Sequence, residues 1–149
     1  PSMEPTLSVG NRIIVNKVSY RLHDVNRGDL VVFRPTGAAV AHGIDDMVKR
    51  VIGLPGETVT AVDGRIWING GLLIEPYLPG HEATDDFGTV PWCADGGMGK
   101  CMVPAGHVFV MGDNRGNSRD SRYIGPIPIE SIAGRAFVRF WPLGSLDRL

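Results

Sequence analysis

A short apolar stretch with two adjacent cations is the part of this sequence best suited to unusual acid–base chemistry. Residues Met47 to Ile52 are rich in β-branched types and predict a strand. Side chains alternate between the faces of a strand, so Lys49 lies among apolar neighbours on one face and Arg50 on the other. We therefore expect a strand covered on both sides. A buried arginine stays charged and needs a carboxylate, whereas a buried lysine can become a neutral base.

A neutral lysine can activate a serine hydroxyl, which is an alternative to the serine–histidine–aspartate triad. The four histidines lie in no recognisable triad pattern and are too scattered to indicate a metal site. The more common alternative is a structural lysine whose amine reaches water. Residue types alone leave four candidate nucleophiles open: Ser2, Ser8, Ser118 and Ser121.

Composition restricts the class of protein. The 149 residues suit one compact domain or a core with a small lobe. A formal net charge of −1 gives no basic surface for nucleic acid, so we expect no nucleic-acid partner. No apolar run approaches the roughly 20 residues of a membrane helix. The sequence begins at Pro1 without an initiator methionine, and we expect an upstream part to be missing.

Frequent turns favour an all-β fold of antiparallel sheets. The 20 glycines and 11 prolines divide the chain into many short segments. Strands are expected within 12–18, 29–34, 47–52, 58–62, 65–69, 72–74, 107–111 and 131–141. We predict a β core formed by 1–57 and 106–149, with a smaller inserted β lobe at 58–105.

Two cysteines lie in a glycine-rich loop of that lobe. Cys93 and Cys101 have no further ligand types at zinc-site spacing. This pattern favours a disulfide over two free thiols, which would indicate an oxidising compartment.

Four segments, taken together, resemble the sequence boxes of bacterial type I signal peptidases, and they occur in family order. They cover the chain apart from the 58–105 lobe. They read Pro-Ser-Met-Glu-Pro-Thr-Leu at 1–7, Gly-Asp-Leu-Val-Val-Phe at 28–33, Lys-Arg-Val-Ile-Gly-Leu-Pro-Gly-Glu at 49–57 and Gly-Asp-Asn-Arg-Gly-Asn-Ser-Arg-Asp-Ser-Arg-Tyr at 112–123. The resemblance implies a catalytic β core of the kind shared with self-cleaving repressor peptidases.

The resemblance assigns the chemistry. Ser2 matches the family nucleophile and Lys49 its general base, with no metal or cofactor. The backbone N–H of Ser2 is expected in the oxyanion hole. Activity should rise with pH through a lysine pKa well below the free value of about 10.4.

Supporting residues follow from the same boxes. The hydroxyl of Ser118 is expected to orient the lysine amine. Asp120 and Arg122 match a structural ion pair behind the site, and Arg50 and Asp113 are assigned to the same network. We expect the carboxylate partner of Arg50 to be Asp120 or Asp113.

The implied substrates are preproteins whose signal peptides are cleaved after an Ala-x-Ala pattern. Shallow pockets would exclude large side chains, and an extended substrate could pair with a strand edge. The expected pocket walls are Met3, Leu7, Ile13, Met47 and Val48.

The resemblance also implies a location on the outer side of the cytoplasmic membrane, with an N-terminal membrane anchor in the missing segment. A membrane surface is therefore an expected partner. Phe137, Phe140, Trp141 and Leu143 could supply an apolar contact. The alternative is that these side chains pack in the core.

Three other classes remain for comparison. A self-cleaving repressor peptidase predicts an upstream DNA-binding segment, and the four boxes and the cysteine pair argue against it. An N-terminal-nucleophile hydrolase would need the nucleophile at residue 1, where the chain has Pro1. In a non-enzymatic β-rich binding module, Lys49 would be structural.

Overall fold

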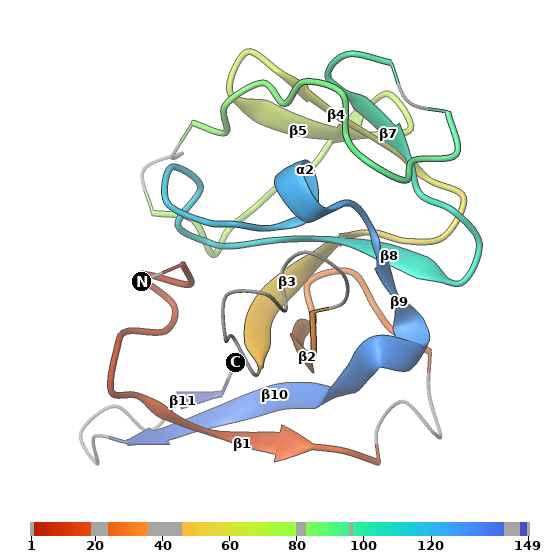
Figure 1. The fold of residues 1–149 in the computed structure, drawn as a ribbon. Coiled ribbons are helices and arrows are strands. Elements are labelled where there is room, and N and C mark those ends of the chain that lie inside the picture. The colour runs from red at the N-terminus through yellow and green to blue at the C-terminus, as the bar shows by residue number, and fades with distance from the viewer. Residues whose placement is uncertain are drawn as a thin grey trace.

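A computed structural model describes residues 2–18, 24–35, 46–79, 83–95, 97–141 and 147–148. The fold consists of antiparallel sheets, as the turn-rich sequence predicted (Figure 1). In the described part of the chain, the larger sheet has the strand order β1-β10-β2-β3-β8-β9, and β11 also pairs with β10. Its strands are β1 (Arg12–Asn16), β2 (Leu30–Phe33), β3 (Met47–Gly53), β8 (His107–Met111), β9 (Ile127–Pro128), β10 (Ile132–Trp141) and β11 (Asp147–Arg148).

A smaller sheet, with the order β6-β5-β4-β7, is formed by strands that all lie between residues 58 and 102. Asp63 and Gly64 form the turn of its central hairpin with positive φ angles, the conformation that an Asp-Gly pair favours. The assignment of 58–105 to a separate lobe stays a prediction. The strands are β4 (Thr58–Val62), β5 (Arg65–Ile68), β6 (Gly71–Leu72) and β7 (Lys100–Met102).

The two sheets share a hydrophobic core. Phe109 and Met111 of β8 pack in one buried cluster with Val59 of β4 and Ile66 of β5. Burial of these side chains from both sheets joins them, since apolar area removed from water is the main favourable term in folding. Cys93 and Cys101 form a disulfide at the edge of this cluster, the pairing favoured by the sequence over two free thiols.

Strand β3 lies between two neighbours and carries both cations into the interior. β2 pairs with β3 from Met47 to Arg50, whereas β8 pairs with β3 only from Arg50 onward. Lys49 is 2% exposed and Arg50 is 7% exposed. The strand is therefore covered on both faces, as its apolar pattern predicted.

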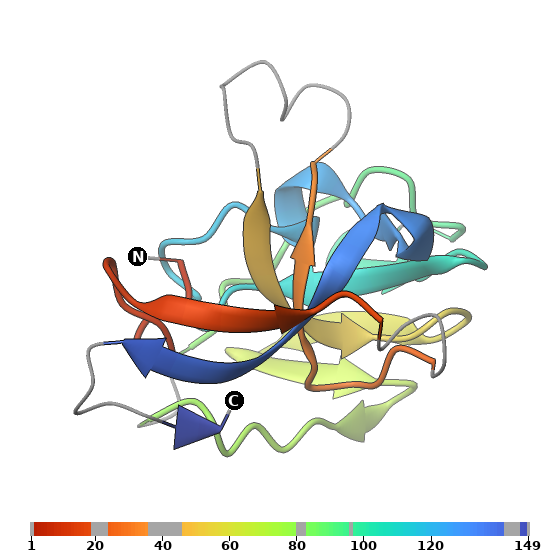
Figure 2. The ribbon, with the colours of Figure 1, turned by 90° about the horizontal axis from the view of Figure 1, so that it is seen from below.

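Short helical turns connect the remaining strands. α2 (Ser121–Ile124) follows the polar loop after β8, and η2 (Ile129–Ser131) precedes β10. Viewed from below, β1 lies beside β10, with which it pairs (Figure 2). The described residues include no helix with the length and hydropathy needed to cross a membrane.

Candidate active site

Ser2 lies on a turn at the start of the chain that is held from two sides. The N–H of Leu7 donates to the carbonyl of Met3 at 2.8 Å and closes the turn. Both apolar side chains of this pair are buried in a cluster with Leu30 of β2. From the other side, the N–H of Asn114 donates to the carbonyl of Ser2 at 3.1 Å. The turn and the polar loop after β8 together fix the backbone of Ser2.

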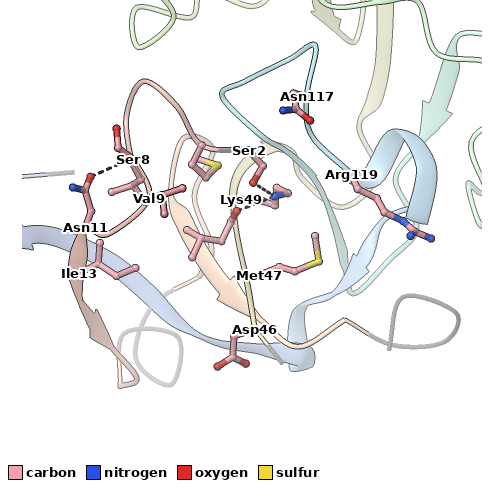
Figure 3. A pocket seen from close by; sticks show the side chains of 13 residues that line it. Ser2, Ser8, Val9, Asn11, Ile13, Asp46, Met47, Lys49, Asn117 and Arg119 are labelled. Carbon is pink, nitrogen blue, oxygen red and sulfur yellow. Dashed lines mark hydrogen bonds between the residues drawn. The ribbon is translucent and has the colours of Figure 1, made fainter. Parts of the chain in front are cut away.

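Lys49 reaches Ser2 from β3 (Figure 3). Its Nζ lies 2.6 Å from Ser2 Oγ and donates to the carbonyl of Val48 at 3.2 Å. Burial lowers the pKa of Lys49 to about 8, although the charges of Asp120 and Asp113 oppose this shift. A substantial share of the amine is therefore neutral near pH 8 and can accept a proton.

Arg50, the next residue along the strand, has a carboxylate in direct contact. Its Nε and Nη2 donate to Asp113 at 2.8 and 2.7 Å, and the hydroxyl of Thr6 donates to the same carboxylate. Of the two expected partners, Asp113 is the one that pairs with Arg50. This bidentate pair joins β3 to the start of the polar loop.

Asp120 and Arg122 form the predicted ion pair, and both are buried. Arg122 Nε donates to Asp120 at 2.9 Å, and Asp120 also accepts the N–H of Gly112 at 2.9 Å. The pair therefore closes the polar loop on itself, between the end of β8 and α2.

Ser118 lies beside Gly112, but the expected hydrogen bond between its hydroxyl and the amine of Lys49 is not formed. Its buried Oγ has no hydrogen-bond partner. A Cβ added at Gly112 would lie 2.2 Å from this Oγ and 2.4 Å from the carbonyl of Ser2, so only glycine fits between them. The amine of Lys49 is instead hydrogen-bonded to Ser2 and to the carbonyl of Val48. An orienting role for Ser118 stays a prediction.

A cavity of about 510 Å³ opens beside Ser2 and Lys49. All five predicted wall residues line it, and they contribute a largely apolar surface. Figure 3 shows the side chain of Arg119 directed away from the Ser2–Lys49 contact. Six further residues line the cavity. Ser8 is one of the four candidate nucleophiles, and Asn117 and Arg119 lie within the box at 112–123. The sequence indicated no role for Val9, Asn11 and Asp46.

Four further polar residues behind the polar loop were missed, because three of them lie outside the recognised boxes. They are Glu75, Tyr77, Thr84 and Arg115. No group of three or more histidine, cysteine, aspartate or glutamate side chains placed to hold a metal occurs among the described residues. The side chains of Phe140 and Trp141, and the whole of Leu143, lie outside the described part of the chain, so the apolar membrane contact stays a prediction.

Comparison with known proteins places the chain in a family. The family model for signal peptidase, peptidase S26, matches residues 1–141. The chain is 45% identical over 143 residues to probable signal peptidase I-2 of Synechocystis sp., covering 95% of this chain and 60% of that relative. Identity to signal peptidase I of Leptolyngbya laminosa is 44%, over 99% of this chain and 68% of the relative.

A solved structure extends the likeness to three dimensions. Signal peptidase I from Enterococcus faecalis is 35% identical and superimposes with a TM-score of 0.59, over 76% of this chain and 97% of that chain. The match to the family model covers far more than half of the residues. The chain belongs to the signal peptidase family, peptidase S26.

Proposed function

We propose that this chain is the catalytic part of a signal peptidase, a serine endopeptidase that removes N-terminal signal peptides from preproteins. Ser2 is the nucleophile and Lys49 is the general base. One observation carries the assignment: a lysine amine that is almost fully buried lies 2.6 Å from a serine hydroxyl beside an apolar cavity. Family membership supports the same reaction.

The mechanism follows from the neutral state of the amine. Lys49 Nζ accepts the proton of Ser2 Oγ while Oγ attacks the scissile carbonyl carbon. The resulting ammonium then donates a proton to the leaving amine, and the C–N bond breaks to leave an acyl-enzyme. Lys49 next takes a proton from water as the water oxygen attacks the ester carbon. The ammonium returns this proton to Ser2 Oγ as the ester C–O bond breaks, which releases the signal peptide and restores the enzyme. The N–H of Ser2 is the oxyanion donor that this proposal includes.

Cleavage after small residues is the second part of the proposal. Asp46 and Arg119 also line the cavity, but much of its wall is apolar and favours small apolar groups. The apolar wall residues are Met3, Leu7, Ile13, Met47 and Val48.

The edge of β3 supports an extended substrate. No described strand pairs with Met47 to Lys49 on the side opposite β2, because β8 begins to pair only at Arg50. A substrate in extended conformation can therefore add main-chain hydrogen bonds at this edge and present alternate side chains to the cavity.

The proposed location is the outer side of a cytoplasmic membrane, with an anchor that precedes Ser2 and the membrane surface as a partner. The Cys93–Cys101 disulfide supports this side, since disulfides persist in oxidising compartments.

Cleavage of a peptide with one Ala-x-Ala site, followed by mass analysis of the products, tests the proposal. The unmodified chain should cut after the second alanine, and Ser2→Ala should abolish cutting. Ser131→Ala removes a hydroxyl that bonds to the Pro128 carbonyl far along the chain, and this control should retain cutting. Equal cleavage by Ser2→Ala, or cutting after large residues, would contradict the proposal.

A further inference from the structure

A buried polar cluster joins the segment after β6 to the polar loop after β8. Its centre is Arg115, whose side chain is fully buried. Arg115 Nη1 donates to Thr84 Oγ1 at 2.7 Å and to Glu75 Oε2 at 3.1 Å, and Nη2 donates to Glu75 Oε1. Its Nε donates to the carbonyl of Gly112 at 3.1 Å. Each nitrogen of this guanidinium is therefore bonded, which a buried charge requires.

Tyr77 ties the second arginine to the same cluster. The Tyr77 hydroxyl donates to Glu75 Oε1 at 2.6 Å, and the guanidinium carbon of Arg50 lies 3.9 Å from the centre of the Tyr77 ring. This stacking is a cation–π contact. Burial and the charge of Glu75 raise the pKa of Tyr77, so its hydroxyl remains a donor. Glu75 thus holds Arg115 directly and supports Arg50 through the ring.

Both arginines lead to the backbone that carries Ser2. Arg115 fixes the carbonyl of Gly112, and the α-carbon of Gly112 packs directly against the carbonyl of Ser2. Arg50 fixes Asp113, which accepts the hydroxyl of Thr6 on the Ser2 turn. Displacement of either arginine would therefore change the position of Ser2 through one or two intervening contacts.

Among the described residues, side-chain hydrogen bonds make this link. Glu75, Tyr77 and Thr84 belong to no described strand, and no described strand pairs the segment 75–84 with the loop 112–118. Neither Glu75 nor Tyr77 lines the cavity beside Ser2. Their effect on the reaction must therefore pass through Arg115 and Arg50, without contact with substrate.

We propose that Glu75 and Tyr77 are positioning residues for the Ser2–Lys49 pair, acting through Arg115 and Arg50. The inference rests on the proposed function, because it is read out in peptide cleavage. A role restricted to stability is the alternative. The two differ in the rate of the folded enzyme, since a displacement of about 1 Å between reacting groups can cost about a hundredfold in rate.

The test compares Glu75→Gln with a matched variant, Glu57→Gln. Glu57 also receives two bonds from one arginine, Arg27, and its side chain is 18% exposed against 11% for Glu75. With both variants folded, Glu75→Gln should lower kcat on the Ala-x-Ala peptide by about tenfold to a hundredfold and leave KM unchanged. Glu57→Gln should keep the kcat of the unmodified chain despite a similar loss of stability.

A second pair of variants keeps the test decisive if Glu75→Gln fails to fold. Tyr77→Phe retains the ring beneath Arg50, whereas Tyr77→Leu removes it, so the phenylalanine variant should keep the higher kcat. If folded Glu75→Gln or folded Tyr77→Leu had an unchanged kcat, the positioning role would be overturned and the proposed function would stand. Failure of the unmodified chain to cut the peptide would instead overturn the proposed function.

Discussion

The two faces of β3 give the neighbouring cations Lys49 and Arg50 different electrostatic surroundings. On one face, the amine of Lys49 is hydrogen-bonded to the hydroxyl of Ser2 and to the backbone carbonyl of Val48. On the other face, Arg50 has two bonds to the carboxylate of Asp113, a bond to the Gly28 carbonyl and an aromatic ring stacked against it. Both side chains are similarly buried, so burial by itself does not distinguish them.

The two side chains differ in how close they lie to a carboxylate. A carboxylate in contact, that of Asp113, compensates the desolvation of Arg50. For Lys49 the carboxylates of Asp113 and Asp120 oppose the effect of burial only in part, and the pKa falls to about 8. One face thus supplies a candidate base, and the other supplies a rigid frame that holds the loop near Ser2.

Replacing the lysine should break the reactive face and leave the frame intact. Lys49→Met removes the proposed base while keeping an unbranched side chain, and we expect cleavage to fall by about 10²- to 10⁴-fold. Unfolding by urea should show unchanged or higher stability, since an apolar side chain has no charge to desolvate. The measurements are kcat/KM and the urea midpoint. Lys100→Met, at a lysine with 41% side-chain exposure, is the control; it should leave kcat/KM unchanged and lower the free energy of unfolding by at most about 1 kcal/mol.

Removing the carboxylate should break the frame. Asp113→Ala leaves the buried Arg50 without its partner, and we expect a stability loss of about 3–5 kcal/mol, measured by urea unfolding. Asp95→Ala provides the comparison, because it breaks the exposed pair with Lys100 and should cost at most about 1 kcal/mol. Equal losses in the two variants would mean that the Arg50 face is not the structural one.

The strands in this comparison could be predicted from the sequence better than the side-chain contacts that connect them. The apolar pattern around residues 47–52 indicated that at least one of the two cations is partly buried, because the strand is covered on both faces. The fold buries both Lys49 and Arg50. The carboxylate partner was narrowed to two residues, and only the fold could choose Asp113, since that choice depends on the register of β3 and β8. The three-residue strand β7 was missed because it is too short to show alternation.

Contacts between irregular segments were beyond prediction. Glu75 and Tyr77 lie in a stretch with turn composition, and nothing in their spacing indicates that they meet Arg115 and Arg50. Such pairs are set by how the two sheets pack. The same limit applies to Ser118, where the resemblance implied a bond to the amine and the fold places its hydroxyl against Gly112 without a partner.

The smallest expected effect is the pH dependence of cleavage and of stability. It tests Lys49 on one face of β3 while the Arg50–Asp113 pair on the other face stays intact. Cleavage requires neutral Lys49, so kcat/KM should rise with pH up to about 8 and then level off. Stability should rise as well. The pKa of Lys49 is lower in the folded chain than the unfolded value of about 10.4, so the unfolded chain binds more protons between these values. The free energy of unfolding should therefore increase by about 3 kcal/mol from below pH 8 to above pH 10.4.

Lys49→Met provides the control for this pH dependence, because it removes the titrating amine and retains the Arg50–Asp113 pair. Its free energy of unfolding should lack the rise between about pH 8 and 10.4, because the amine that would titrate there has been removed. Urea unfolding at a series of pH values measures both curves. If the two curves were parallel, another group would cause the rise, and the amine of Lys49 would not be the one that burial neutralises. The difference between the curves therefore isolates the reactive face of β3 from the structural one.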